Sequence, residues 1–318
     1  MKLLFLLAPL LLTLGVSAAR ADEPADPPAW AGSEISVKHS FSIASLMPGF
    51  EPDYNPVLVQ SLSIDPAWRL TKKLRLTAHL GVETELTNSD VTSYQRQPLI
   101  EDTTLTATYT LPDLPAELRP SASLRLTLPT SKEAIARERI AGFGAAFGVK
   151  REFHPREDVT VAPFVTLRAA YNWQLSTSLV YDGPSISTCS AARGDACEEF
   201  DHSGARSTVA AFVQVVGVNV ELPHDVALTA QAWWAQSWLY DLTPALGPTG
   251  EPVPERAGGS DWRLANVYLV AAEWQATQRW KLAGGFQTEN PQQRPDGSYY
   301  TPFFNRYTQF FVTAAAVF

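Results

Sequence analysis

The chain of 318 residues has little sulfur, with only two cysteines and two methionines. Both cysteines, Cys189 and Cys197, lie in one polar segment, CSAARGDAC. A tetrahedral metal site takes four ligands, and this segment adds only Asp195 to the two thiols. Because the N-terminal residues predict export from the cytoplasm, a local disulfide between Cys189 and Cys197 is the favoured interpretation, and no metal site is predicted.

Long apolar runs are also missing. Beyond the N-terminal segment no stretch of about 18 apolar residues occurs, which excludes a helical membrane protein. The net charge is −8, which argues against nucleic acid as a partner. No motif for a cofactor is present, so none is expected.

The N-terminal residues have the order of a secretory signal peptide. Lys2 precedes an apolar stretch, and the small residues Ala19 and Ala21 mark a cleavage site. We therefore predict a signal peptide over residues 1–21. Residues 22–32, which begin with DEPADPPAW, are rich in proline and acid and are predicted to be a solvated periplasmic lead-in. The folded domain is expected to span residues 33–318.

Apolar and polar residues alternate through the rest of the chain. The segments KLRLTAHLGVETEL (73–86), TTLTATYTL (103–111) and SASLRLTL (121–128) follow a period of two without a slip. This period is typical of strands, whereas a helix requires recurrence at three and four residues. The segment AGFGAAFGVK (141–150) imitates the glycine spacing of membrane helix pairs but is too short to span as a helix, so we predict a strand there.

Short and long connections alternate between these strands. Brief turns such as PHD and ATQR are followed by long polar segments such as LTPALGPTGEPVPERAGG. In an up-and-down barrel all short turns lie at one rim and all long loops at the other, whereas a sandwich or propeller mixes them. The sequence therefore predicts an all-β fold, a transmembrane up-and-down antiparallel β-barrel of about 12 strands with short periplasmic turns and long extracellular loops. The strands are expected near residues 34–45, 57–69, 73–87, 103–111, 119–129, 140–152, 158–175, 206–222, 225–240, 261–275, 279–289 and 305–318.

The chain ends with YTQFFVTAAAVF, a strand pattern that continues to Phe318. Together with the signal peptide and the alternating strands, this ending resembles Gram-negative outer-membrane β-barrel proteins of the porin and transporter type, over the whole mature chain. The resemblance implies location in the outer membrane, contact with its lipid, and recognition by the barrel assembly machinery during biogenesis. The residues that carry this assembly signal are Phe310, Val312 and Phe318.

The alternation predicts two faces for the barrel wall. The lipid face is expected to carry Leu74, Leu76, Leu80, Val82, Leu124, Leu126, Leu128, Val161, Val165, Leu167, Val226, Leu228, Val270 and Phe310. Trp233 is expected to point inward, unlike most tryptophans, which collect at strand ends as an interfacial girdle. The candidate pore-lining residues are Lys38, Arg75, His79, Glu83, Glu85, Arg125, Lys150, Arg168, Asn172, Gln231, Arg263, Glu273, Lys281, Gln287 and Glu289.

Two functions fit this inward face. The charges line a water-filled path through which small solutes pass passively, or they form a ladder of ion pairs that plugs a narrow barrel. In the second case the protein is a structural or surface-display barrel whose disulfide-closed loop is the working part. A hydrolase is less favoured, because Asp201, His202 and Ser203 in FDHSG are adjacent, and adjacent residues of an extended chain point in different directions. No residue is predicted to be catalytic.

Overall fold

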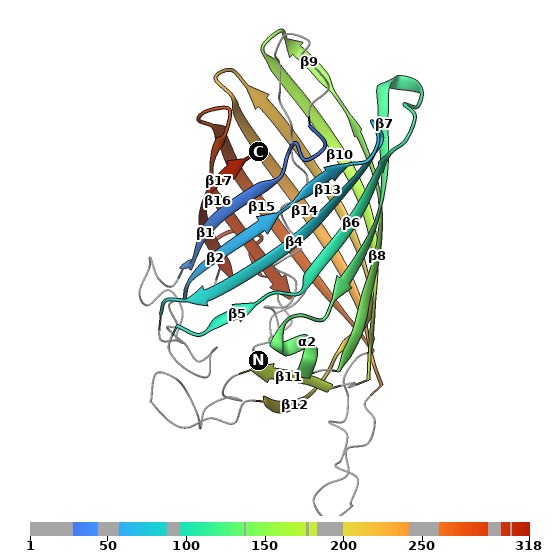
Figure 1. Cartoon of the computed structure of the whole chain (residues 1–318), viewed down its shortest axis with the longest axis vertical. Helices are drawn as coiled ribbons and strands as arrows, with labels where there is room; N and C mark the ends of the chain where they lie inside the picture. Colours follow the sequence, from blue (N-terminus) through green and yellow to red (C-terminus); the bar gives the residue numbers. More distant parts are fainter. Residues whose placement is uncertain are drawn as a thin grey trace, which may run out of the picture.

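The computed structural model describes residues 28–43, 57–87, 96–136, 138–175, 178–182, 200–241, 261–291, 300–305 and 307–318. Within these residues, twelve antiparallel strands form a closed barrel (Figure 1). Each strand pairs with its neighbours around the wall, and β1 pairs with β17 to close it. The predicted fold class is confirmed. The wall strands are β1 (Glu34–Ser42), β2 (Leu58–Asp65), β4 (Leu74–Glu85), β6 (Thr103–Thr110), β7 (Leu118–Leu128), β8 (Arg139–Arg151), β10 (Val159–Gln174), β13 (Thr208–Leu222), β14 (Val226–Leu239), β15 (Trp262–Gln275), β16 (Trp280–Pro291) and β17 (Thr308–Val317).

Closure extends to the last residue of the chain. The register between β1 and β17 runs from Glu34 opposite Val317 to Ser42 opposite Gln309. The N–H of Phe318 then donates to the carbonyl of Ser33 at 2.9 Å, and the N–H of Gly32 donates to the carbonyl of Phe318 at 2.7 Å. Gly32 has a φ of 86°, a conformation that favours glycine.

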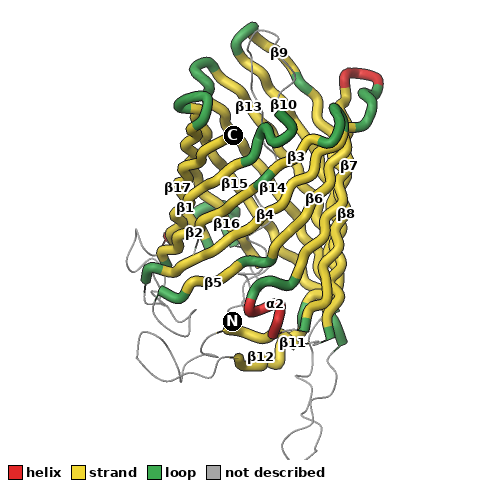
Figure 2. The backbone as a smooth tube through the Cα atoms, viewed as in Figure 1, coloured by secondary structure: helices red, strands yellow, loops and turns green. Residues whose placement is uncertain are grey.

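The connections sort by length between the two rims, as the sequence predicted. Five brief connections lie at the rim that holds the C-terminus, and the strand ends that the longer connections join lie at the opposite rim (Figure 2). No helix among the described residues is long and apolar enough to cross a membrane.

The structure also contains short elements that the sequence analysis did not predict. The strand expected over residues 57–69 is divided at Pro66, which cannot donate a ladder hydrogen bond, so β3 (Ala67–Arg69) is a separate strand. The end of the segment NSDVTSYQRQPLI, expected to be a loop, forms β5 (Pro98–Ile100) against β4. The other additions are the 3-10 helix η2 (Pro115–Glu117), α2 (Lys132–Ala136), β9 (Phe153–Arg156), and the hairpin of β11 (Ser178–Asp182) and β12 (Phe200–Arg206).

Two of these additions change where individual residues lie. His154 falls between the strands expected over residues 140–152 and 158–175 but lies in β9, which pairs with β10 and extends the wall at the short-turn rim. Asp201, His202 and Ser203 were expected in a solvated loop but lie in β12, which pairs with β11. In both places a hairpin can extend because its backbone groups find partners along the neighbouring strand.

The outer face of the wall is apolar and exposed. Leu124 is 67% exposed, Val165 47% and Leu80 44%, and each alternates with less exposed residues on the same strand. An exposed apolar surface of this extent is unusual for a soluble protein. It fits a barrel whose outer face contacts lipid, because a closed barrel satisfies its backbone hydrogen bonds within the wall.

Candidate functional site

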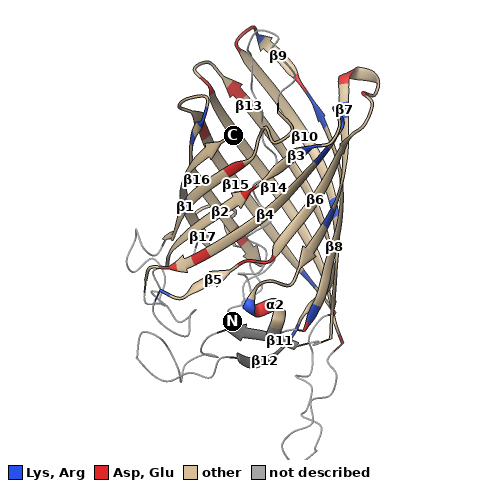
Figure 3. Cartoon of the chain, viewed as in Figure 1, with Lys and Arg blue, Asp and Glu red and all other residues tan. Residues whose placement is uncertain are grey.

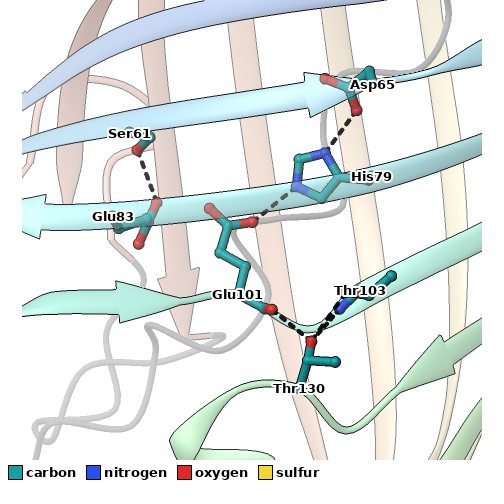
Figure 4. Close-up of polar contacts among 7 residues, drawn as sticks. All are labelled: Ser61, Asp65, His79, Glu83, Glu101, Thr103 and Thr130. Carbon is teal, nitrogen blue, oxygen red and sulfur yellow. Dashed lines mark hydrogen bonds and ion pairs between the residues drawn. The ribbon is translucent and has the colours of Figure 1, made fainter.

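One histidine on the inner wall contacts two carboxylates (Figure 4). The Nδ1 atom of His79 in β4 lies 2.7 Å from Oδ1 of Asp65, and its Nε2 atom lies 2.9 Å from Oε2 of Glu101. Carboxylate oxygens accept hydrogen bonds, so an imidazolium with a proton on each nitrogen satisfies both contacts. The side chain of His79 is 18% exposed, which shields these pairs from bulk water.

The side chain of Glu101 passes over Gly81 of β4 to reach His79. The backbone N–H of Glu101 donates to the carbonyl of Gly81 at 2.9 Å, and its carbonyl accepts a hydrogen bond from the Thr130 hydroxyl at 2.9 Å. A Cβ atom at position 81 would lie 2.5 Å from the carboxyl carbon of Glu101. Glycine at this position therefore leaves the space that the Glu101 carboxylate occupies.

The next polar side chains along this wall are also partnered. The hydroxyl of Ser61 in β2 donates to Glu83 Oε1 at 3.0 Å. Lys38 in β1 is close enough to Glu83 and Glu101 for electrostatic attraction, and its Nζ atom lies 5.7 Å from the centroid of the Phe311 ring. Lys38 and His79 thus offset part of the negative charge of Asp65, Glu83 and Glu101. We call this group the acidic wall: Lys38, Ser61, Asp65, His79, Glu83 and Glu101.

A second charged region lies further around the barrel, on the β7, β8 and β10 side, where basic segments gather in Figure 3. Arg125 in β7 lies opposite Gly144 of β8, and Arg168 in β10 lies opposite Ala146 of the same strand. The two guanidinium groups are close enough to repel each other. Neither contacts a carboxylate in the described part of the chain. We call Arg125 and Arg168 the arginine wall.

An aromatic ring packs against the guanidinium group of Arg168. Its guanidinium carbon lies 5.1 Å from the centroid of the Trp233 ring, within the range of a cation–π contact. The indole nitrogen of Trp233 donates to Gln231 Oε1 at 3.0 Å, which fixes the ring. Trp233 is 5% exposed and points inward, where the sequence analysis placed it.

Trp233 belongs to an apolar cluster inside the barrel. Its members come from four consecutive wall strands, β10, β13, β14 and β15, and Val215 at the centre is fully buried. The cluster thus forms an apolar patch on the inner face of these four strands. Its buried members are Phe164, Val213, Val215, Trp233, Ala235 and Val267.

Ion pairs at the short-turn rim involve three of the predicted lining residues. Lys281 Nζ lies 2.8 Å from Glu34 and 3.8 Å from Glu273. Lys150 lies 3.0 Å from Glu152, which also pairs with Arg119. Burial raises the pKa of the Glu152 carboxyl, but the hydrogen bonds and charges of Lys150 and Arg119 outweigh it, so its pKa is below the ordinary value.

The remaining candidates are distributed over the wall. Arg75 donates to the carbonyl of Gly32 at 2.9 Å, and Asn172 donates to the carbonyl of Thr208 at 3.1 Å. Glu85 is 5% exposed and accepts a hydrogen bond from Thr87. One carboxylate oxygen of Glu289 is buried without a partner. The half-buried Arg263 in β15 and Gln287 in β16 complete the set.

The structure thus joins Lys38, His79 and Glu83 in the acidic wall and Arg125 with Arg168 in the arginine wall. Sequence reasoning missed Asp65 and Glu101. Asp65 shares the alternation of Ser61 in β2 and was detectable from that pattern. Glu101 follows the unpredicted strand β5, so no periodicity marked it. That these residues line a solute path stays a prediction.

Several predicted features lie outside the described residues. These are the signal peptide over residues 1–21 and the cysteines Cys189 and Cys197. Across the part of the chain that the structure describes, no group of His, Cys, Asp and Glu side chains has the arrangement of a metal site. The cluster at His79 is no exception, because its two carboxylates bind opposite ring nitrogens.

Comparison with known proteins supports the fold. No protein-family model matches the chain, and no curated protein matches it in sequence. An outer-membrane channel from Pseudomonas putida F1 superposes with a TM-score of 0.51 at 13% identity, covering 94% of this chain and 100% of that one. The NanC porin gives a TM-score of 0.44 at 8% identity, covering 89% and 98%, a likeness too weak to support further argument.

Proposed function

We propose that this protein is an outer-membrane channel that passes small solutes passively through its lumen. The observation that carries the proposal is the contrast between the two faces of one closed wall. The outside is apolar and exposed, whereas polar and charged side chains from β1, β2, β4, β7, β8 and β10 occupy the inside. Such a wall separates a lipid-facing surface from a polar interior, which is the arrangement of barrels with aqueous channels.

The route to the membrane is part of the same proposal. A signal peptide over residues 1–21 would direct export, and residues 22–32 would lie in the periplasm next to the short-turn rim. The terminal pattern of Phe310, Val312 and Phe318 would present the assembly signal. The pairing of β17 with β1 supports this role, because the last strand completes the barrel.

Single-channel recording with site-specific thiol modification tests the proposal. In a background with Cys189→Ser and Cys197→Ser, the variant Ser123→Cys places a thiol on the same face of β7 as Arg125. A negatively charged thiol reagent is expected to reduce the conductance of this variant, because it narrows the path. The absence of conductance steps from correctly folded protein would overturn the proposal.

A matched control lies one residue away. Leu124 is 67% exposed on the outer face of β7, so Leu124→Cys in the same background carries its thiol outside the barrel. Modification there is expected to leave the conductance unchanged. An equal loss of conductance in both variants would show that the current does not follow the lumen.

A further inference from the structure

The charged groups of the barrel interior differ in how completely they are paired. Lys281 has Glu34 as a partner, His79 has Asp65 and Glu101, and Lys150 has Glu152. Arg125 and Arg168 have no acidic partner within the described residues. Two cations of the same wall are therefore left without a compensating negative charge.

Their guanidinium nitrogens are also available for hydrogen bonding. No hydrogen bond to described residues is made by Arg125 or Arg168, and none of their nitrogens is among the buried, unpartnered ones. By contrast, Arg75 and Arg139 each bury an unpartnered Nε atom. The guanidinium nitrogens of the arginine wall are thus unpaired among the described residues and not fully enclosed.

The strand between the two arginines carries small residues on its inner face next to them. Gly142, Gly144, Ala146 and Gly148 of β8 alternate with outward phenylalanines. A Cβ atom at Gly144 would lie 3.4 Å from Cβ of Arg125. The absence of a side chain at Gly144 therefore leaves space beside the Arg125 side chain. The space over β8 is thus bounded by a guanidinium on each side.

The apolar cluster borders this space. It occupies the β10 to β15 side of the interior and supports Arg168 through the Trp233 ring. A polar solute is expected to favour the polar groups beside the cluster, which include both arginines. Planar guanidinium groups bind carboxylates and phosphates through paired hydrogen bonds.

We propose that Arg125 and Arg168 form a binding site for small oxyanions, which makes the channel selective for carboxylates and phosphates over cations of similar size. The inference rests on the proposed channel function. The anion takes the place that a carboxylate partner fills elsewhere in the interior. Trp233 acts as a positioning residue, because it contacts Arg168 and not the anion.

The test is inhibition of chloride current in planar bilayers, with inorganic phosphate and acetate as separate probes. For the wild-type protein we expect saturable inhibition and a reversal potential in a potassium chloride gradient that indicates anion preference. In Arg125→Gln/Arg168→Gln the half-inhibiting concentration is expected to rise at least about tenfold, since each charged hydrogen bond contributes about a factor of ten. Inhibition by phosphate alone would restrict the site to phosphates, and inhibition by acetate alone would restrict it to carboxylates.

Two further variants keep the test decisive. Lys281→Gln removes an interior cation that already has acidic partners, and it is expected to shift inhibition less than about twofold. Arg125→Lys/Arg168→Lys keeps both charges, so it should retain preference for chloride while losing inhibition by the oxyanions. This variant remains informative if the glutamine variant does not fold.

The outcomes separate the two proposals. Folded protein without conductance steps would overturn the channel itself. Conductance steps with no anion preference, or with inhibition that the glutamine variant leaves unchanged, would overturn the oxyanion site while the channel stands.

Discussion

The acidic wall and the arginine wall belong to one barrel and come from the same alternation of residues, yet their chemistry differs. In the acidic wall each carboxylate has a partner: Asp65 and Glu101 contact His79, and Glu83 contacts Ser61. In the arginine wall, Arg125 and Arg168 have no acidic partner among the described residues. Every carboxylate of the acidic wall therefore has a partner within the protein, whereas the arginine wall is open to an external anion.

The two walls also differ in how densely they are built. Gly81 of the acidic wall is covered by the Glu101 carboxylate, whereas Gly144 beside the arginine wall has only ordinary contacts around it. A dense, paired wall suits a structural role, because breaking one buried partner leaves uncompensated charge. A thin wall with unpaired donors suits recognition.

The largest effect is expected for His79→Ala. The substitution removes the group between Asp65 and Glu101 and leaves their charges uncompensated, at a cost of about 2–4 kcal/mol in the free energy of unfolding. Denaturant titration of the refolded barrel, followed by its heat-modifiable gel mobility, measures this change. His39→Ala, on the exposed outer face of β1, is the control and should keep the wild-type midpoint. An unchanged denaturation midpoint for His79→Ala would show that the acidic wall does not stabilise the barrel.

A pair of glycine substitutions compares the density of the two walls directly. In Gly81→Ala the new methyl group displaces the Glu101 carboxylate, and we expect a loss of about 1–2 kcal/mol because an overpacked site must rearrange. Gly144→Ala meets its nearest neighbour at 3.4 Å and should change the stability by less than about 0.5 kcal/mol. Both are measured by the same denaturant titration. A larger loss for Gly144→Ala than for Gly81→Ala would contradict the difference in packing.

The smallest effect is expected from salt. Charges that face water are screened over about 10 Å at 0.1 M ionic strength and over about 3 Å at 1 M. The anion preference that we assign to Arg125 and Arg168 should therefore weaken as the mean potassium chloride concentration rises. Reversal potentials at a fixed concentration ratio check this. A preference that is independent of salt would point to a charge shielded from the path.

Most of the fold was predictable because each long strand is marked by its own alternation of apolar and polar residues. The period of two over segments such as 73–86 located β4, and the alternation of short and long connections indicated a barrel before any pairing was known. The exceptions are short elements. β5 and β9 have three and four residues, and such lengths carry too few positions for a periodic signal.

The candidate site was predictable only in part. Alternation identified Lys38, His79 and Arg168 as inward residues, because a strand sends every second side chain to the same face. It did not identify their partners. The Glu101 carboxylate lies over Gly81 where it contacts His79. Trp233, which contacts Arg168, is 65 positions further along the chain.

Local features of the chain are enough to predict the class of this protein: a β-barrel with an apolar outer face, a polar interior, and loops sorted by length between two rims. These properties follow from local periodicity and from the length of each connection. Which interior charges are paired, in contrast, becomes visible only in the folded barrel. Pairing depends on which strands become neighbours and on the register between them, and that choice is made by closure of the whole barrel through β1 and β17.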